Sequence, residues 1–259
     1  MPIQNTPIRT TDRFKLTHIA AILEGLEETI IFKLIDRAQF AHNATVYETD
    51  KNVFEGADGH SLFHLRLLRH ETMDAEFGRF HVPEERPFMT DLPASKRIEK
   101  LPPESGLHVV DFNAINVSDK ILKAYIRLLP EICLSGDDGQ YGSTVEHDVA
   151  ALQAVARRVH FGALYVAESK YQSDPKKYKD LARKGDRAGL LASLTRADVE
   201  ARILSRVADK VAHIQAAINN EVRRSVPPEA IMAFYRESII PLTKEGEIRY
   251  FLHREYGEA

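Results

Sequence analysis

The sequence contains little cysteine, no long apolar run and no marked excess of charge of either sign. Cys133 is the only cysteine in 259 residues, which excludes an internal disulfide framework and a cysteine-rich zinc site and is typical of a reducing compartment. No apolar stretch is long enough for a signal peptide or a membrane span, so we expect a cytoplasmic protein without a membrane partner. With 35 basic and 38 acidic residues, the net charge of -3 favours no nucleic-acid partner.

The signatures of several enzyme classes are also missing. The sequence has no glycine-rich phosphate loop, no nucleophile elbow, and no pair of histidines at helical spacing around a glutamate. His70-Glu71 lacks a second histidine four residues later, and Asp137-Asp138-Gly139 lacks the further ligands of a calcium loop. We therefore expect no metal site and no nucleotide cofactor.

Apolar residues recur at three- and four-residue steps, which predicts an all-α fold. No segment alternates with a period of two over a useful length, and composition does not shift enough to mark two domains. We predict a single helical-bundle domain over residues 1–259, with about ten or more helices and ligand sites between them. The clearest helix runs from Thr11 to about Ala41, and its apolar stripe consists of Ile19, Ile22, Leu23, Leu26, Ile30, Leu34 and Ala38.

Capping residues and prolines predict the next boundaries. Residues 42–60 resemble a loop, after which Ser61 is expected to cap a helix that Pro83 stops. A long connection then reaches Val117, and a connection of that length is usually functional or a subunit contact. Its prolines after Pro83 are Pro87, Pro93, Pro102 and Pro103.

The second half of the chain is also predicted to be helical. Ser118 starts a helix that Pro130 kinks or ends, and Ser143 is the expected cap of a helix that reaches about Tyr171. A helix from Arg196 to about Ala217 follows. Breaks are expected at Asp174-Pro175, Gly185-Asp186 and Thr195, and the last helix opens at Pro227 with Pro241 inside it.

Charged residues inside otherwise apolar helices are the candidates for chemistry. Arg196 with Glu200, and Thr243 with Glu247, are four residues apart and could each share one helix face. The spacing fits solvated surface pairs equally well. Further members of this set are Arg157, Arg158, Glu168 and Lys170.

Several blocks of sequence, in order along nearly the whole chain, resemble the eukaryotic-type chorismate mutases. They are Leu26-Glu27-Glu28-Thr29-Ile30-Ile31-Phe32, Gly142-Ser143, Arg157-Arg158-Val159-His160-Phe161-Gly162, Val166-Ala167-Glu168-Ser169-Lys170 and Ile240-Pro241-Leu242-Thr243-Lys244-Glu245. The resemblance implies an all-α, type II-like homodimer that converts chorismate to prephenate in phenylalanine and tyrosine biosynthesis without a cofactor.

The resemblance also implies roles for individual residues. Arg158 would hold a carboxylate, with Arg157 beside it in the substrate-binding set, and Lys170 and a protonated Glu247 would donate to the breaking ether oxygen. Burial and neighbouring carboxylates are expected to raise the pKa of Glu247. Glu200 would bind the ring hydroxyl, and the pocket would be lined by Thr243, Val166 and Ile240.

The chain departs from the family pattern at the site. Ala20 stands where the family has a substrate-gripping arginine, and Arg196 stands where it has an asparagine, so a cation is lost and another gained. One additional residue near Tyr165 would turn Lys170 by ~100° relative to Arg158, unless a π-bulge absorbs it. We expect Arg196 either to replace the missing cation or to be a solvated partner of Glu200.

The effector site of the family is altered as well. Arg79, Gly142 and Ser143 match residues that bind tyrosine or tryptophan between subunits. Gly78 and Glu146, however, replace an arginine and a threonine, which predicts weak or absent regulation.

Two alternatives stand beside the mutase hypothesis. The altered set of cations for binding carboxylates would also suit a mutase or lyase for a related dianion, such as isochorismate or an amino-substituted chorismate. A catalytically silent homologue with a binding role would explain Ala20, whereas the joint presence of Lys170, Glu200, Thr243 and Glu247 argues against it.

Overall fold

A computed structural model describes residues 13–49, 55–57, 59–98 and 105–257. These residues form helices and no β-strand, with only two isolated bridges, Ala41 to Leu134 and Val109 to Arg254. The predicted all-α class is confirmed. Over the same residues, no helix has both the length and the apolar character needed to cross a bilayer.

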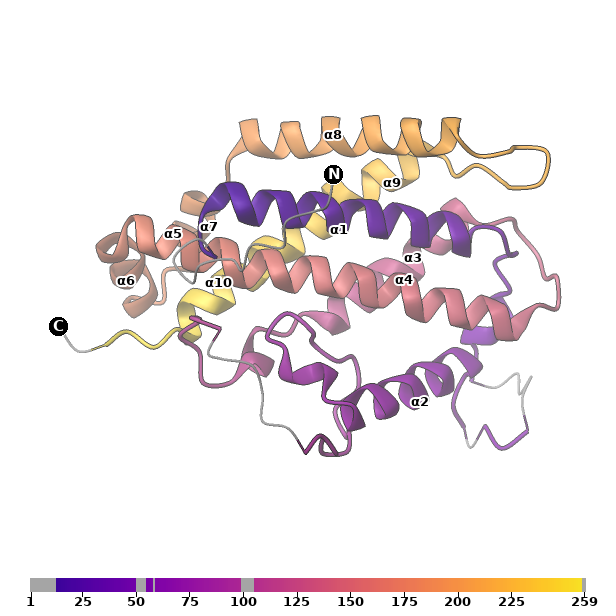
Figure 1. The fold of residues 1–259 in the computed structure, drawn as a ribbon, viewed down its shortest axis with the longest axis horizontal. Helices are drawn as coiled ribbons and strands as arrows, with labels where there is room; N and C mark the ends of the chain where they lie inside the picture. Colours follow the sequence, from indigo (N-terminus) through magenta and orange to yellow (C-terminus); the bar gives the residue numbers. More distant parts are fainter. Residues whose placement is uncertain (1–12, 50–54, 58, 99–104, 258–259) are drawn as a thin grey trace, which may run out of the picture.

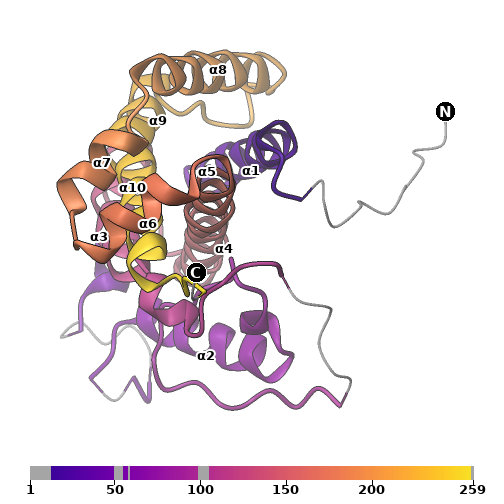
Figure 2. The ribbon, with the colours of Figure 1, turned by 90° about the vertical axis from the view of Figure 1, so that its left-hand side faces the viewer.

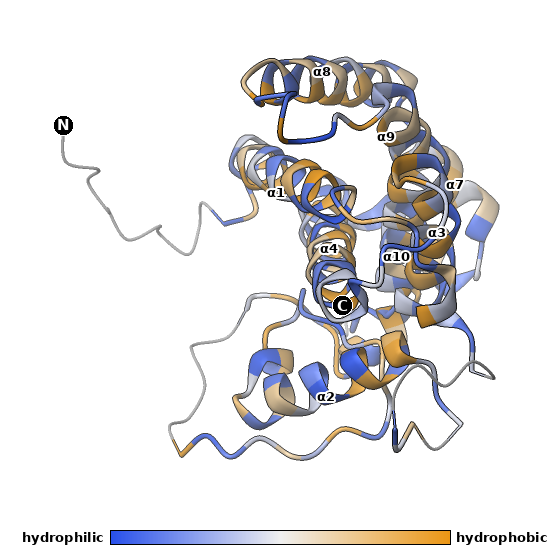
Figure 3. Ribbon diagram, turned by 90° about the vertical axis from the view of Figure 1, so that its right-hand side faces the viewer, coloured by the Kyte–Doolittle hydropathy of each residue, from blue (hydrophilic) through white to orange (hydrophobic). Residues whose placement is uncertain are grey.

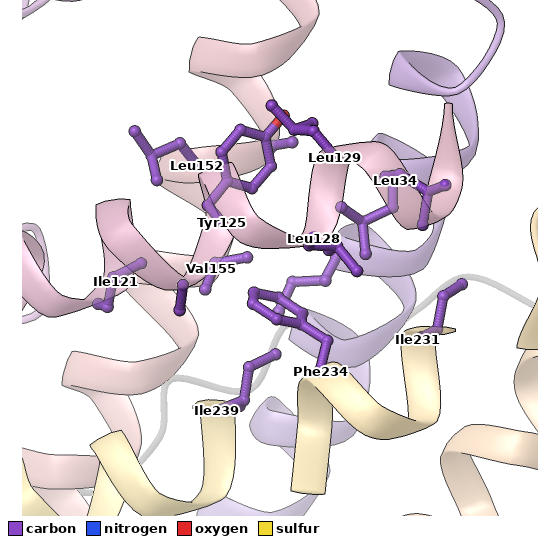
Figure 4. Close-up of a cluster of buried hydrophobic side chains, with 14 of the residues drawn as sticks. Leu34, Ile121, Tyr125, Leu128, Leu129, Leu152, Val155, Ile231, Phe234 and Ile239 are labelled. Atoms are coloured by element: carbon purple, nitrogen blue, oxygen red, sulfur yellow. The ribbon is translucent and has the colours of Figure 1, made fainter. Parts of the chain in front are cut away.

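Two long helices form the centre of the molecule. Helix α1 (Leu16–Arg37) lies along α4 (Tyr141–Phe161) for much of its length (Figure 1). The C-terminal half of α1 is the better buried half, because Ile30, Ile31 and Leu34 pack into the main core. Figure 4 shows how that core joins α1, α3 (Ser118–Ile132), α4 and the C-terminal helices around Tyr125, Leu152 and Phe234.

A buried polar network fixes the far end of this helix pair. The guanidinium of Arg37 on α1 pairs with the carboxylate of Asp148 on α4, and both side chains are fully buried. Asp148 also accepts hydrogen bonds from the hydroxyls of Tyr47 and Tyr125 at 2.6 and 2.8 Å. Because buried charges are tolerated only when paired and hydrogen-bonded, this network specifies how α1 and α4 meet.

Two predicted boundaries in the first half of the chain need correction. Ser61 does cap α2 (Leu62–Glu76), accepting from the His64 N–H, but Pro83 does not stop this helix. It ends at Glu76 because Gly78 adopts a left-handed φ of 80°. Helix α3 begins at Ser118 as predicted and continues past Pro130 to Ile132.

The connection between α2 and α3 is long, as predicted. The short helical turns η2 (Ala44–Tyr47), η3 (Arg79–His81) and η4 (Phe112–Ile115) interrupt the irregular segments on either side of α2. Thr11, Pro102 and Pro103, which entered the predicted boundaries, lie outside the described residues.

The predicted π-bulge is present. Helix α4 passes without a break through a π-helical turn, η5 (Gly162–Val166), into α5 (Ala167–Ser173). The predicted cap at Ser143 is wrong, because α4 begins at Tyr141 with Gln140 as its N-cap and no capping side chain. Ser143 lies within the first turn of the helix.

The remaining helices complete the bundle. Asp174 and Asp186 cap α6 (Pro175–Arg183) and α7 (Arg187–Leu194) with their carboxylates, at the breaks predicted from sequence. The chain ends in α9 (Pro228–Phe234), a second π-helical turn η6 (Tyr235–Ile239), and α10 (Ile240–His253). Pro241 is the second residue of α10, where its missing N–H is accommodated by the π-helical turn before it.

Helix α8 (Ala197–Ala216) lies alongside α1 at one edge of the bundle, on the side away from α2 (Figures 1 and 2). Only Val207 and Val211 of α8 are buried, and both belong to its C-terminal half. Figure 3 shows hydrophilic and hydrophobic residues mixed along this helix. The N-terminal half of α8 is therefore held loosely against α1, and a cavity lies between them.

Candidate active site

The cavity has a volume of about 590 Å³, and besides Leu194 at the end of α7 it is lined by four parts of the chain. These are the N-terminal half of α1, the N-terminal half of α8, the beginning of α10, and the α4–η5–α5 segment. Apolar side chains from three of these elements, such as Leu23, Ile203 and Ile240, form much of its wall. A volume of this size suits a small organic ligand.

The structure brings eight of the nine predicted catalytic and substrate-binding residues to this cavity. They are Arg158, Val166, Lys170, Arg196, Glu200, Ile240, Thr243 and Glu247. Arg157 is the ninth and is not brought there, because its Nε lies 3.3 Å from Glu85 Oε1 and its side chain is half exposed. Consecutive helical residues point about 100° apart, so Arg157 and Arg158 cannot both face one pocket.

The π-helical turn decides that Lys170 faces the same way as Arg158. In an unbroken α-helix, the twelve steps between these residues would leave Lys170 about 120° away from Arg158. The extra residue absorbed by η5 reduces this difference to about 20°. The insertion in this segment therefore leaves the cationic face of the cavity intact.

Lys170 and Glu247 form the centre of the site. Lys170 Nζ lies 2.9 Å from Glu247 Oε2, and also 3.4 Å from the carbonyl oxygen of Leu194. The close approach of α10 to η5 makes this contact possible, because a Cβ at Gly246 would lie only 2.5 Å from the Cβ of Ala163. Glycine at that position leaves room for the methyl group of Ala163 and so lets α10 lie close to η5.

Burial raises the pKa of Glu247 above its ordinary value, although the nearby charges of Lys170, Lys244 and Arg158 oppose the shift. The direction agrees with the prediction from sequence, but the predicted contribution of neighbouring carboxylates is wrong. Glu245, the nearest acid in sequence, accepts instead from Arg187 and Arg249. A carboxyl group that is protonated near neutral pH can donate a hydrogen bond to a ligand oxygen.

Arg158 forms the base of the cavity and is only 3% exposed. Its Nη1 donates to Thr243 Oγ1 at 3.1 Å, and its Nη2 lies 3.8 Å from Glu27 Oε1. Its buried Nε has no hydrogen-bond partner among the described residues. A buried donor without a partner is costly, so a ligand carboxylate that accepts from this guanidinium would be strongly stabilised.

At the mouth of the cavity, Arg196 and Glu200 both belong to the lining, but the alternative that they form an ion pair with each other is wrong. Arg196 is the N-cap of α8 and has extended backbone angles, so the geometry of an intrahelical pair does not apply. Its Nε and Nη2 donate to the two carboxylate oxygens of Asp198, each at 3.1 Å. Glu200 pairs with Lys244 Nζ on α10 at 2.9 Å.

Three cations of the site were missed from sequence. Lys244 lies inside one of the family blocks, so its position beside Thr243 was an available signal. Arg202 and Arg206 also line the cavity, and their only signal was the spacing of Val199, Arg202 and Arg206 along one face of α8. Arg206 donates to the buried Glu27 on α1 through two of its nitrogens, Nε at 2.9 Å and Nη2 at 2.8 Å.

The side of the cavity formed by α1 carries no charge. Its residues there are Leu16, Thr17, Ile19, Ala20 and Leu23. The cations that line the cavity therefore come from the α4–η5–α5 segment, from α8 and from α10: Arg158, Lys170, Arg196, Arg202, Arg206 and Lys244. Glu200 and Glu247 are the acids among the lining residues, which leaves an excess of positive charge.

Glu168 does not belong to this site. Its carboxylate is bound by Arg254 at 2.8 and 3.0 Å and by the Tyr250 hydroxyl at 2.6 Å, on the opposite side of α5. Within the described part of the chain, no cluster of histidine, cysteine and acidic side chains is arranged to hold a metal ion.

The predicted effector residues lie away from the cavity. Gly142 lines a separate depression of about 370 Å³, which also includes Arg66, Arg69 and His70 of α2. Arg79 is held by Asp74 at 2.7 Å and by Glu85 at 2.9 Å, and does not line that depression. Ser143 is exposed on the first turn of α4.

The chain is similar to known proteins over nearly its full length. A chorismate mutase from Trichoderma parareesei is 36% identical over 253 residues, covering 92% of each chain. One from Schizosaccharomyces pombe is 36% identical over 250 residues, covering 94% of this chain and 97% of the other. The crystal structure of a Candida albicans chorismate mutase in complex with L-Trp superimposes with a TM-score of 0.84 at 34% identity, over 95% of this chain and 94% of the other. No protein-family model matches the sequence.

Proposed function

We propose, from the premise that this chain belongs to the family of eukaryotic chorismate mutases, that the cavity beside α1 binds chorismate and rearranges it to prephenate. The observation that carries the proposal is the contact of Lys170 Nζ with Glu247 Oε2 at 2.9 Å, in a cavity whose base is the buried guanidinium of Arg158. Two donors and a carboxylate-binding cation meet there within one small volume.

The chemistry requires positioning more than it requires reactive groups. Chorismate carries two carboxylates and rearranges within itself, as the ether C–O bond breaks and a C–C bond forms. The reaction needs no nucleophile and no cofactor, but the enzyme must hold the compact conformer and stabilise the negative charge that develops on the ether oxygen. Fixed donors in a largely apolar cavity do both.

Each residue has a role that its surroundings support. Arg158 binds one carboxylate through its unpaired Nε and the neighbouring Nη groups. Lys170 and protonated Glu247 donate to the ether oxygen, and the upward shift of the Glu247 pKa through burial favours the protonated form. Glu200 accepts from the ring hydroxyl, and Arg196 adds positive charge at the mouth. Thr243, Val166 and Ile240 shape the wall.

Arg157 has no part in this mechanism. Its guanidinium is directed to Glu85, outside the cavity, and turning it inward would displace Arg158 from a buried position. We assign it to the surface contact between α4 and the segment after η3.

We further propose a single-domain protomer that forms a two-fold dimer. Helix α2 ends in exposed apolar side chains, Met73 at 46% and Phe77 at 67%, beside the long connection that follows it. Burial of these groups would favour self-association. Regulation by aromatic amino acids would be weak, because Arg79 is already bound by Asp74 and Glu85.

A related dianion is the second candidate substrate. Ala20 leaves the α1 side of the cavity uncharged, so the second carboxylate must be bound from another direction. Isochorismate carries the hydroxyl at another ring position, and an amino-substituted chorismate carries an amine in its place. Both keep the enol ether and the two carboxylates, and the altered group would meet Glu200.

An absorbance assay of substrate consumption tests the proposal. The purified chain should consume chorismate, and chromatography should identify prephenate as the product. The same assay with isochorismate ranks the two candidates by kcat/KM. A Lys170→Ala variant is the matched control for background rearrangement. Equal rates for the parent and this variant on both substrates would contradict a mutase function.

A further inference from the structure

Helices α1 and α8 meet through a regular ladder of charge pairs. Arg206 Nη1 lies 3.2 Å from Glu24 Oε1, and one turn further along both helices Lys210 Nζ lies 2.9 Å from Glu28 Oε1. Each step of four residues on α1 is matched by four residues on α8, so the two helices run in parallel with a constant register here. One turn before the Glu24–Arg206 pair, the same register places Ala20 opposite Arg202.

The series of ion pairs between α1 and α8 therefore ends at the cavity. Arg202 lines the cavity, but the α1 residue at its register is Ala20, which offers no carboxylate. The ion pair of Arg202 is instead with Asp198, one turn earlier on its own helix, at 3.4 Å. Asp198 is already bound by Arg196 through two shorter contacts of 3.1 Å. Arg202 thus shares a carboxylate that is occupied by a better-placed arginine.

We infer that Arg202 is the second carboxylate clamp of the substrate site, so that a dianion is held between the buried Arg158 and the rim cation Arg202. This inference rests on the proposed function, and it names Arg202 rather than Arg196 as the functional replacement for a cation at position 20.

Two observations favour Arg202 over Arg196. Arg202 belongs to the helical face of Val199, Ile203 and Arg206 that forms the cavity wall, whereas Arg196 precedes the helix as its N-cap. In addition, the Arg202 side chain is 72% exposed and has one long contact at 3.4 Å, so it can turn to a ligand with little loss. A ligand carboxylate would replace water and the shared Asp198 as the partner of the Arg202 guanidinium. The new charge-assisted hydrogen bonds would be stronger than the present contact with Asp198.

Steady-state kinetics of single variants test the assignment. Arg202→Ala should raise KM about tenfold or more and leave kcat within about threefold, because it removes binding at a distance from the ether oxygen. Arg202→Lys should recover part of the affinity. Arg196→Ala should change KM by less, and Arg183→Ala, an exposed arginine at the end of α6, is the control for general loss of positive charge.

Relocating the cation sharpens the test. Because position 20 faces position 202 across the cavity, the double variant Ala20→Arg with Arg202→Ala should restore a KM near that of the parent. Restoration is not expected if the loss of Arg202 merely loosens α8.

The outcome can be separated from that of the proposed function by measuring binding without turnover. A non-reacting oxabicyclic dicarboxylate of the size of chorismate should bind the parent in calorimetry and lose about tenfold in affinity with Arg202→Ala, whether or not chorismate is rearranged. A KM and a dissociation constant within twofold of the parent would overturn the inference, as would an equal loss with Arg183→Ala. If the parent does not rearrange chorismate but Arg202→Ala still weakens binding of the dicarboxylate, the mutase proposal is contradicted and the role of Arg202 in binding a carboxylate is supported.

Discussion

The base and the mouth of the cavity are built differently. At the base, Arg158 is 3% exposed and Glu247 4%, and their neighbours are fixed by contacts between α4, η5 and α10. At the mouth, the side chains of Arg196 and Asp198 are 64% and 58% exposed and pair with residues of their own helix. The base is therefore organised before a ligand enters, whereas the mouth can exchange its partners.

This difference assigns the two parts to different tasks. Groups that stabilise developing charge must be in place without reorganisation, which requires burial and packing. Groups that select and retain a ligand can be exposed, since a surface ion pair contributes little and is easily replaced. We expect substitutions at the base to affect kcat and substitutions at the mouth to affect KM.

The largest effect is expected at the base. Lys170→Ala removes one of the two proposed donors to the ether oxygen and leaves the buried Glu247 without its ammonium partner. We expect kcat to fall by about 10²–10³. Lys176→Ala, at an exposed lysine of α6, should leave kcat unchanged. A fall of less than fivefold for a folded Lys170→Ala protein would refute the distinction between base and mouth.

A pH profile provides the second test of the base. Only protonated Glu247 donates, so activity is present below its raised pKa and is lost as pH rises through that value. Glu247→Gln carries a permanent N–H donor, and its profile should be flat where that of the parent falls. Inactivity of Glu247→Gln at every pH, with normal substrate binding, would rule out the donor role.

A smaller effect should follow from crowding the base without removing a charged group. In Gly162→Ala, the new Cβ would lie 2.8 Å from Thr243 Cγ2 and 3.4 Å from Arg158 Nη1. We expect a loss of about 1–3 kcal/mol in the free energy of unfolding and a several-fold lower kcat/KM. Gly142→Ala, where the new Cβ meets nothing within 4 Å, is the matched control. Chemical denaturation and kinetics on both variants would show whether the base tolerates displacement.

The smallest effect is expected at the mouth and has the opposite sign. Asp198→Asn removes the carboxylate that Arg196 and Arg202 share, so both arginines become available to an anionic ligand. We expect KM to fall by about two- to fivefold at low ionic strength, and the effect to disappear as salt is added. An increase in KM would mean that Asp198 orients the arginines instead of competing for them.

Local sequence predicted the parts of the fold that depend on local physics. The cap at Ser61 and the breaks at Asp174-Pro175 and Gly185-Asp186 depend on hydrogen bonds within a few residues. The start of the last helix at Pro228 depends on the fixed φ and missing N–H of proline. One additional residue between two blocks indicated either a rotated Lys170 or a π-helical turn, and the structure contains the turn. Pro83 was wrongly predicted to stop α2, because Gly78 had already ended the helix with a left-handed conformation.

The structure brings together the predicted site residues that share a helix at fixed spacing, but the predicted set is incomplete where separate helices meet. Thr243 and Glu247 lie one turn apart on α10, so if one of them faces the cavity the other does as well. Arg206 reaches Glu27 across 179 positions of sequence, and no local pattern reports such a contact. Lys244 lies within a family block, but nothing in the local sequence marks it as the partner of Glu200 on another helix.

The sequence by itself determined that the chain is helical, where most helices begin, and which side chains could hold a dianion, because helical period, capping and residue chemistry are local properties. The tertiary structure alone decided which of these side chains share the cavity. It placed Arg158 inside and its neighbour Arg157 outside, gave Glu200 to Lys244, and brought Arg202 and Ala20 to the wall of one cavity. It also raised the pKa of Glu247, because burial depends on helices that pack together from distant parts of the chain.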